Sequence, residues 1–254
     1  MTERKRIPVI LLLVASLVAL PLAQARVFES DSGDVRIIGV PMVLQIGRSY
    51  CAPATMVRVL RYYGIEADQE TLAQRVGSTE DNGTDVGKML DEVSKICAGY
   101  NLKVETIMGF DYKRYAAIIA KYNAIAVKRG SPVLELDEKH IDLSNTFAKA
   151  DIEILRKTST KKDLRAFAKT VREHVRAETP LIWGAVLGIA AEPDIAPYTS
   201  GGHLRLIIGF NDKTKEIIYS DPWGPKHATK RMALADAYAI TMSLHALASA
   251  PEPQ

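Results

Sequence analysis

Cys51 stands in a sequence context that favours a reactive thiolate. It ends the segment Gln45-Ile-Gly-Arg-Ser-Tyr-Cys51, and Pro53 follows two positions later. Proline suits the first turn of a helix because its missing N–H would have had no intrahelical partner there. A helix that begins at this point turns unpaired N–H groups and its positive dipole end toward the sulfur, which lowers the pKa of a thiol. The pattern therefore predicts a cysteine nucleophile at the start of a helix.

Two downstream residues have the types and spacing of a base and its orienting group. His203 follows two glycines and opens the apolar run Leu204–Phe210, and Asp221 follows the next such run, Ile217–Ser220. Runs of this length on either side of a turn are typical of a β-hairpin. A hairpin places the start of its first strand beside the end of its second, so we expect the Asp221 carboxylate to hold the tautomer of the His203 ring. Trp223 is expected to cover that hydrogen bond from water.

Gln45 is the candidate donor for the oxygen of an attacked carbonyl. It lies six residues before Cys51, a gap that a loop can fold so that the carboxamide N–H₂ meets the developing oxyanion. The backbone N–H of Cys51 would be the second donor. Outside this context a surface glutamine would be the expectation. The predicted catalytic set is Cys51, His203, Asp221 and Gln45, and this chemistry needs neither a metal nor an organic cofactor.

The same residues resemble the peptidase C39-like family, which comprises papain-like cysteine peptidases related to the double-glycine leader peptidases. The motifs that carry the resemblance are, in order, Gln45, Cys51 with Pro53-Ala54, Tyr63-Gly64, Gly202-His203 and Asp221-Pro-Trp-Gly224. The resemblance covers about residues 38–110 and 181–225. It implies a papain-like fold in which Cys51 is the nucleophile, His203 the base, Asp221 the orienting group and Gln45 part of the oxyanion hole, with a peptide or protein as substrate.

Two other classes of function remain open at this point. One is a different acyl-transfer enzyme on the same site, such as an amidase, a transglutaminase-like cross-linker or a cell-wall peptide hydrolase. The other is a non-catalytic binding module of the same fold in which Cys51 and Cys97 form a disulfide. Ala52 stands where the family usually has glycine, which keeps the second class open. Cys97 closes an apolar stripe at helical spacing, so we expect it to be a buried core residue.

The surrounding sequence predicts an α+β fold in which N-terminal helices pack on a C-terminal antiparallel sheet. Arg36–Gln45 reads as an extended entry segment, and the expected helices run from Cys51 to Gly64, from Asp68 to Val76, from Thr84 to Cys97, from Tyr112 to Val127 and after a cap at Thr160–Asp163. The expected strands are Leu181–Leu187, Leu204–Phe210 and Ile217–Ser220. Ser131–Ala150 is ambiguous, and Ala233–Leu247 fits a strand or a helix. The stretch from about 111 to 180 is expected to be a helical insertion in a single domain, 26–254.

The first 25 residues have the pattern of a secretory signal peptide. Arg4-Lys5-Arg6 precedes the apolar run Ile7–Leu22, and Ala23-Gln24-Ala25 is a small-residue cleavage site. We therefore expect an exported, periplasmic or secreted protein that begins at Arg26 and has no stable membrane insertion after cleavage. An uncleaved N-terminal membrane anchor is the alternative.

The charge of the chain bears on its partners. The formal net charge is +3, and loss of Glu3, Arg4, Lys5 and Arg6 with the signal peptide leaves +1. A balance this close to neutral argues against a nucleic-acid partner. Nothing in the sequence indicates an oligomeric state.

Overall fold

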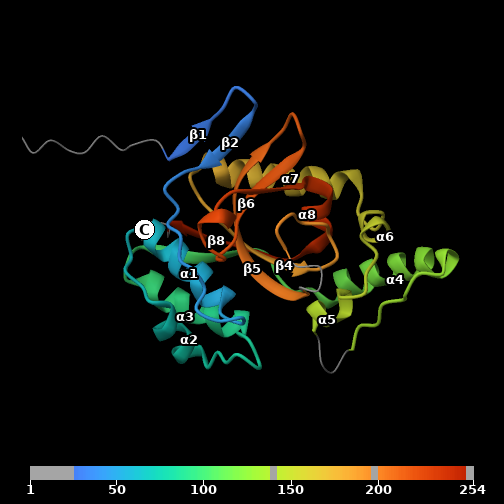
Figure 1. The fold of residues 1–254 in the computed structure, drawn as a ribbon, viewed down its shortest axis with the longest axis horizontal. Coiled ribbons are helices and arrows are strands. Elements are labelled where there is room, and N and C mark those ends of the chain that lie inside the picture. Colours follow the sequence, from blue (N-terminus) through green and yellow to red (C-terminus); the bar gives the residue numbers. More distant parts are fainter. Residues whose placement is uncertain (1–25, 138–141, 196–199, 250–254) are drawn as a thin grey trace, which may run out of the picture.

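Helices and one curled antiparallel sheet make up the molecule, so the expected α+β class is confirmed (Figure 1). The computed structural model describes residues 26–137, 142–195 and 200–249. The predicted signal peptide, residues 1–25, lies outside the described residues. In Figure 1 the first three helices lie on one side of the sheet, and the next three extend from the opposite end.

The sheet of the described residues has eight strands, and every pairing between them is antiparallel. The order along its main path is β1-β2-β5-β4-β8-β3, and β6 and β7 extend it from the other edge of β5. The strands are β1 (Val27–Glu29), β2 (Asp34–Ile37), β3 (Leu102–Met108), β4 (Leu181–Leu187), β5 (Gly201–Asn211), β6 (Glu216–Ser220), β7 (Lys230–Ala233) and β8 (Thr241–Ser249). Every residue of β4 is buried, and β5 is buried from His203 onward, which explains why both read as continuous apolar runs.

The three N-terminal helices appear where the sequence predicts them. They are α1 (Cys51–Tyr62), α2 (Gln69–Val76) and α3 (Val86–Ala98). Gly64, with φ of 77°, allows the turn that follows α1, a backbone conformation that costs glycine little. The third helix begins slightly later than expected because the side chain of Asp85, rather than that of Thr84, caps it by accepting from Lys88 N–H.

Cys97 is fully buried in the core, as expected, and β4 and β5 form the centre of the same core. The predicted hairpin of Leu204–Phe210 and Ile217–Ser220 is confirmed as β5 and β6. The ambiguous segment after Ala233 contains both alternatives, since α8 (Leu234–Ile240) leads directly into β8. The entry segment is extended only as far as Ile37, where β2 ends.

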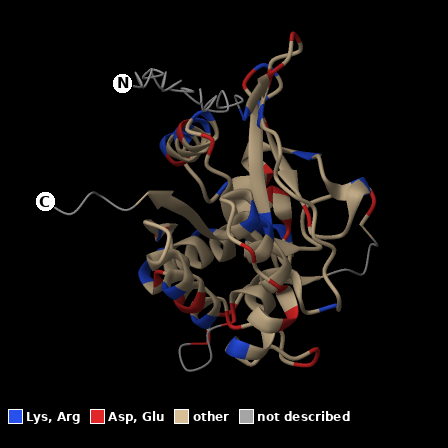
Figure 2. Ribbon diagram, turned by 90° about the vertical axis from the view of Figure 1, so that its left-hand side faces the viewer, with Lys and Arg blue, Asp and Glu red and all other residues tan. Residues whose placement is uncertain are grey.

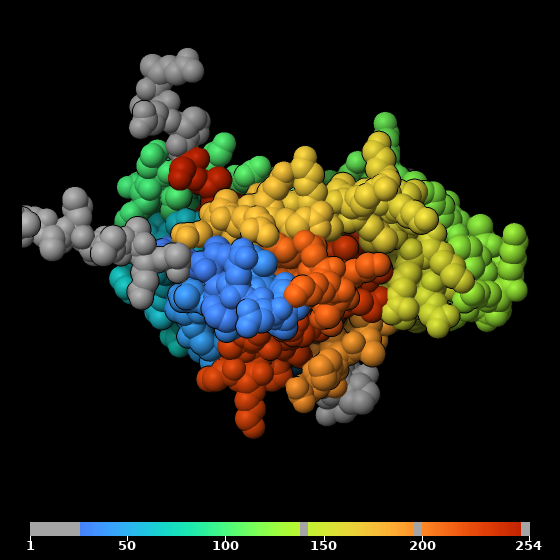
Figure 3. Space-filling model, turned by 90° about the horizontal axis from the view of Figure 1, so that it is seen from above, coloured from blue at the N-terminus to red at the C-terminus, as the bar shows by residue number. Residues whose placement is uncertain are grey.

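The stretch 111–180 is helical and divides between two cores. Its helices are α4 (Tyr112–Arg129), α5 (Leu143–Phe147), α6 (Ile152–Arg156) and α7 (Lys161–Arg176). The apolar face of α7, which includes Phe167, Val171 and Val175, packs into the main core, and α7 lies beside the β1–β2 hairpin in the view from above (Figure 3). Side chains of α4, α5 and α6 form a second, smaller core. Whether the stretch is an insertion within one domain remains a prediction.

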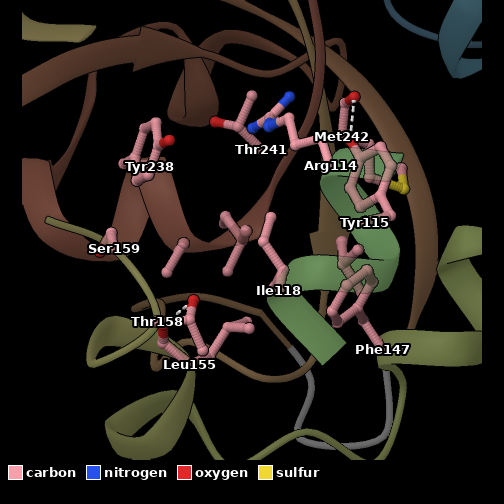
Figure 4. A pocket seen from close by; sticks show the side chains of 13 residues that line it. Arg114, Tyr115, Ile118, Phe147, Leu155, Thr158, Ser159, Tyr238, Thr241 and Met242 are labelled. Carbon is pink, nitrogen blue, oxygen red and sulfur yellow. Dashed lines mark hydrogen bonds between the residues drawn. The ribbon is translucent and has the colours of Figure 1, made fainter. Parts of the chain in front are cut away.

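A small cavity marks the junction between the second core and the sheet (Figure 4). Its volume is about 20 Å³, which leaves room for a single water molecule. Tyr115 of α4 lines it and donates a hydrogen bond to the backbone oxygen of Met242 at 2.6 Å. The cavity therefore reflects imperfect packing between α4 and β8 and is too small for a ligand.

Charged residues of both signs are interspersed over the helices and loops (Figure 2). Within the described ranges, no helix combines the length and the apolar composition that crossing a membrane requires.

Candidate active site

Cys51 is the first residue of α1, as the position of Pro53 predicted. Tyr50 precedes the helix without making a side-chain cap, so the first N–H groups of α1 are not occupied by a capping side chain. One turn further on, the Thr55 hydroxyl donates to the backbone oxygen of Leu204 at 2.9 Å. This buried bond fixes the start of α1 against β5 and thereby places Cys51 beside the strand that carries His203.

His203 and Asp221 meet through a short buried hydrogen bond. His203 Nε2 lies 2.6 Å from Asp221 Oδ1, and the two residues are 6% and 0% exposed. Asp221 follows β6, and its own N–H donates to the backbone oxygen of His227 at 3.0 Å. Because Nε2 is engaged with the carboxylate, Nδ1 is the ring nitrogen left to face the Cys51 thiol, whose interaction with the imidazole lowers the pKa of the thiol. The structure thus brings three of the four predicted site residues into one chain of contacts.

The surroundings of these groups favour a charged pair of thiolate and imidazolium. Burial raises the pKa of the Cys51 thiol, but the hydrogen bond and charge of His203 outweigh it, so the pKa lies below its usual value. Burial lowers the pKa of His203, whereas Asp221 and the Cys51 sulfur raise it by more. Burial also raises the pKa of Asp221, yet Arg205 and His203 hold it at about 2. Asp221 is therefore an anion at neutral pH, and it stabilises the proton on His203.

Trp223 lies flat against the histidine ring. The two ring centroids are 4.5 Å apart, and the planes differ by 28°. The edge of the His227 ring meets the same tryptophan from another side, with centroids 5.6 Å apart. The indole therefore covers the imidazole where the sequence placed it, and the π-face of an indole also attracts an imidazolium.

Gln45 lies at the same site but is engaged differently from the expectation. Its Nε2 donates to the backbone oxygens of Gly47 at 2.7 Å and Arg48 at 3.2 Å, while its buried Oε1 accepts no hydrogen bond from the described residues. The backbone N–H of Gln45 donates to the oxygen of Pro222 at 2.8 Å, which ties its loop to the segment after Asp221. The carboxamide must release one loop carbonyl before it can donate to a substrate oxygen.

The site borders a cleft of about 920 Å³. Cys51, His203, Gln45 and Trp223 all line it, and on the far side it reaches Ser144 of α5 and Met242 of β8. A volume of this size accommodates several residues of a peptide. Among the described residues there is no group of three or more histidine, cysteine or acidic side chains that could hold a metal ion.

Both cysteines are unbonded in the structure, Cys51 at the cleft and Cys97 in the core. The sequence reasoning did not identify three buried charged residues near Asp221, namely Arg58, Arg205 and Glu192. The sequence does contain an indication of Arg205, because this charged residue interrupts the otherwise apolar run Leu204–Phe210 within β5. A buried charge needs a partner, so an arginine in a buried strand points to a carboxylate nearby.

Comparison with known proteins gives one family. The model of the Peptidase_C39 like family matches residues 37–150 and, in an overlapping second match, 133–244. Together these ranges span most of the chain. No curated protein is significantly similar to the sequence.

Solved structures with related architecture share little sequence with this chain. The peptidase domain of Streptococcus ComA, a bifunctional ABC transporter involved in a quorum-sensing pathway, is 15% identical with a TM-score of 0.42, over 84% of this chain and 100% of that one. A protein described as a C39-like peptidase from Bacillus anthracis is 12% identical with a TM-score of 0.47, over 85% and 97%. Xylellain, a cysteine protease from Xylella fastidiosa, is 10% identical with a TM-score of 0.45, over 91% and 94%.

Replacement of Asp221 by Asn tests the charge arrangement of the site. The neutral amide no longer stabilises the imidazolium, so the pKa of His203 falls, that of Cys51 rises and less thiolate exists at pH 6. We expect alkylation of Cys51 by iodoacetamide at pH 6 to slow by about tenfold, the change that one pKa unit produces. The rate is measured by intact mass, with the alkylated residue mapped by peptide analysis.

Asp212→Asn is the matched control, because Asp212 is an exposed residue of the β5–β6 turn that pairs with Arg172. Its alkylation rate should equal that of the wild type. An Asp221→Asn variant that is alkylated as fast as the control would contradict the arrangement.

Proposed function

This chain belongs to the Peptidase_C39 like family, and from that premise we propose that it is a cysteine peptidase that hydrolyses peptide bonds through Cys51, His203 and Asp221. The observation that carries the proposal is the continuous chain of contacts from the Cys51 thiol through the His203 ring to the buried Asp221 carboxylate, 2.6 Å from that ring. Each member has the neighbour that its role requires.

The geometry supports a two-step acyl transfer. The Cys51 thiolate attacks the carbonyl carbon of a bound peptide, and the C–N bond breaks as the His203 imidazolium gives its proton to the leaving amine. The product of this step is a thioester on Cys51. His203, now neutral, takes a proton from water, whose oxygen attacks the thioester, and the acid product leaves as the thiolate forms again. Asp221 keeps the ring oriented and stabilises its positive charge in both steps.

The oxyanion needs donors at the attacked carbonyl, and two groups of the described chain have suitable positions. One is the Cys51 backbone N–H at the start of α1, where the helix dipole adds to its effect. The other is Gln45, whose Nε2 is held by the carbonyls of Gly47 and Arg48. In this proposal a substrate oxygen replaces the longer of these two hydrogen bonds, the one to Arg48.

The cleft supports a peptide as substrate. Its volume is enough for several residues, and its lining comes from separate parts of the chain, among them the loop that holds Gln45, α5 and β8. A cleft that is open at its surface, rather than a closed pocket, suits a polymer that is cut between its ends.

Export is a separate part of the proposal and rests on the N-terminal sequence. Cleavage after Ala25 would leave Arg26 as the first residue. The N–H of Arg26 donates to Glu178 Oε1 at 3.1 Å, and its guanidinium lies over the Tyr62 ring and donates to the Tyr62 backbone oxygen. An α-ammonium group at this position would face a carboxylate, which supports Arg26 as the start of a stable mature chain.

Replacement of Cys51 by Ala tests the nucleophile. The variant lacks the sulfur that forms the thioester, so we expect no acyl-enzyme in acid-quenched samples and loss of cleavage products. The assay uses a diverse mixture of casein-derived peptides, with new N-termini identified by mass spectrometry. Cys97→Ala is the control, since that cysteine lies in the core away from the cleft, and it should retain cleavage. Cleavage by Cys51→Ala at the rate of the wild type would refute the proposal.

Replacement of Gln45 by Ala tests the oxyanion donor. Loss of a donor that acts on the developing charge lowers kcat with little change in KM, and we expect a fall in kcat of about 100-fold. Gln74→Ala, at an exposed position of α2, provides the control and should leave both constants unchanged. A Gln45→Ala variant in which KM rises while kcat is kept would assign the residue to substrate binding instead.

N-terminal sequencing of the protein from a culture that expresses the full chain tests export. We expect the mature protein in the periplasmic or culture fraction, beginning at Arg26. Replacement of Ala25 by a large residue such as Phe should block cleavage, because the cleavage site requires small side chains. A cell-associated protein that keeps residues 1–25 would favour the membrane-anchor alternative.

A further inference from the structure

A second buried ion pair lies directly behind the Asp221 carboxylate. Arg205 of β5 donates from both terminal nitrogens to Glu192, at 2.7 Å to Oε2 and 3.0 Å to Oε1. The side chains are 0% and 2% exposed. One of the same nitrogens lies 3.6 Å from Asp221 Oδ2, which is an ion-pair distance but too long for a hydrogen bond. Glu192 belongs to the loop between β4 and β5, the loop that returns to the cleft at Ser200.

Strand register explains why Arg205 is placed there. His203 and Arg205 are two residues apart on β5, so their side chains leave the same face of the sheet. Leu206 pairs with Ser220, which sets the residue after β6, Asp221, alongside that same stretch of β5. A single face of one strand therefore presents both the base and the arginine to one carboxylate.

Aromatic rings hold the guanidinium from both neighbouring strands. Trp183 of β4 is the residue paired with Arg205 in the sheet, and the centroid of its ring lies 4.9 Å from the guanidinium carbon. The Tyr219 ring lies 4.8 Å away on the β6 side, and its hydroxyl donates to Glu192 Oε2 at 2.5 Å. Trp183 is itself fixed by a hydrogen bond from Nε1 to Thr241. The two rings and Glu192 together hold the guanidinium in its position beside Asp221.

The two carboxylate oxygens of Asp221 differ in their hydrogen bonding. Asp221 Oδ1 is bound to His203, whereas Oδ2 is buried and accepts no hydrogen bond from the described residues. An arginine that was free to approach such a carboxylate would donate one N–H to each of its two oxygens. Here Glu192 accepts one N–H from each terminal nitrogen of Arg205 and holds the guanidinium 3.6 Å from Oδ2, so the arginine supplies charge to Asp221 without competing with His203 for Oδ1.

We infer that Arg205 is a positioning residue for the active site, held by Glu192 so that it keeps Asp221 ionised while leaving Oδ1 aligned on His203. The inference rests on the proposed function. It extends the chain of contacts beyond the carboxylate, to a residue of the loop that borders the cleft. Stability alone is a weak explanation for the pair, because apolar replacements of a buried ion pair are often as stable.

Other charged groups also face Asp221, and they set the sign of the expected effect. They are Arg58 from α1, Lys230 from β7 and His203, with Glu192 and Tyr219 on the far side of Arg205. Burial raises the pKa of Asp221, and among the groups that oppose it Arg205 has the largest effect. Without Arg205 the pKa of Asp221 rises. A protonated Asp221 no longer stabilises the imidazolium, so the Cys51 thiolate forms only at higher pH.

The test measures the rate of Cys51 alkylation by iodoacetamide as a function of pH, with thermal unfolding of each variant measured in parallel. The main variant is R205M/E192Q, which removes the pair together and leaves no unpaired buried charge. We expect its rate at pH 5 to fall at least about tenfold, which corresponds to a rise of one unit in the pKa of Cys51. R205K restores a cation and should recover part of the loss. R231M removes the ion pair that Arg231 of β7 makes with Asp34 of β2, and this variant should match the wild type.

A second variant keeps the test decisive if R205M/E192Q does not fold. E192Q is isosteric but removes the charge that holds Arg205. The guanidinium can then donate to both oxygens of Asp221 and draw the carboxylate away from His203. Alkylation at pH 5 should therefore be slower in this variant too. A folded R205M/E192Q or E192Q variant with the pH profile of the wild type would overturn the inference. A wild-type Cys51 that reacts with the pH dependence of an ordinary cysteine would instead overturn the proposed function, so the two failures are distinguishable.

Discussion

A carboxylate that is fully buried and still ionised is the constraint on which the rest of this site depends. Asp221 is 0% exposed, and a charge in such a place is costly unless cations and hydrogen bonds compensate it. The structure supplies them from two elements: Arg205 and His203 on β5, and Arg58 on α1. Only with this compensation does the carboxylate keep its charge next to the imidazole, and the raised pKa of His203 and the lowered pKa of Cys51 both follow from it.

One of the cations that compensate the charge of Asp221, Arg58, also connects the helices to the sheet. Arg58 lies one to two turns after Cys51, and its guanidinium donates to the backbone oxygens of Pro41 and Ser220 and to the Ser220 hydroxyl. The arginine therefore joins α1 to the residue just before Asp221. Thr55 makes the corresponding bond from α1 to β5 through Leu204. Two buried contacts on successive turns of one helix thus align the nucleophile with both strands of the β5–β6 hairpin, which carries the rest of the site.

The sequence predicted the parts of the fold that local pattern determines. The α+β class, α1 with its start at Cys51, and the β5–β6 hairpin are confirmed, because proline position and apolar run length constrain them directly. The roles of Cys51, His203, Asp221 and Gln45 remain predictions. The strand β3 was missed because its alternating burial is weak, and β1 and β2 were missed because a polar turn dominates their stretch. Arg205 and Glu192 could not be paired from sequence, since only the register of β5 and the path of the following loop bring them together.

The helical stretch 111–180 meets the site at Ser144, which lines the cleft, and at Met242 of β8, which it contacts. The backbone oxygen of Met242 accepts the hydrogen bond from Tyr115 of α4, and its sulfur lies 3.7 Å from the Ser144 hydroxyl of α5. Met242 and Ser144 both line the cleft. The wall opposite the Gln45 loop is therefore fixed to β8, the neighbour of the strand that pairs with β5. The core of α4, α5 and α6 includes Val186 of β4, the strand that pairs with β5, and Ser144 lies against Gly202, the residue before His203. The packing of these helices therefore bears on the strand that carries the base as well as on the wall of the cleft.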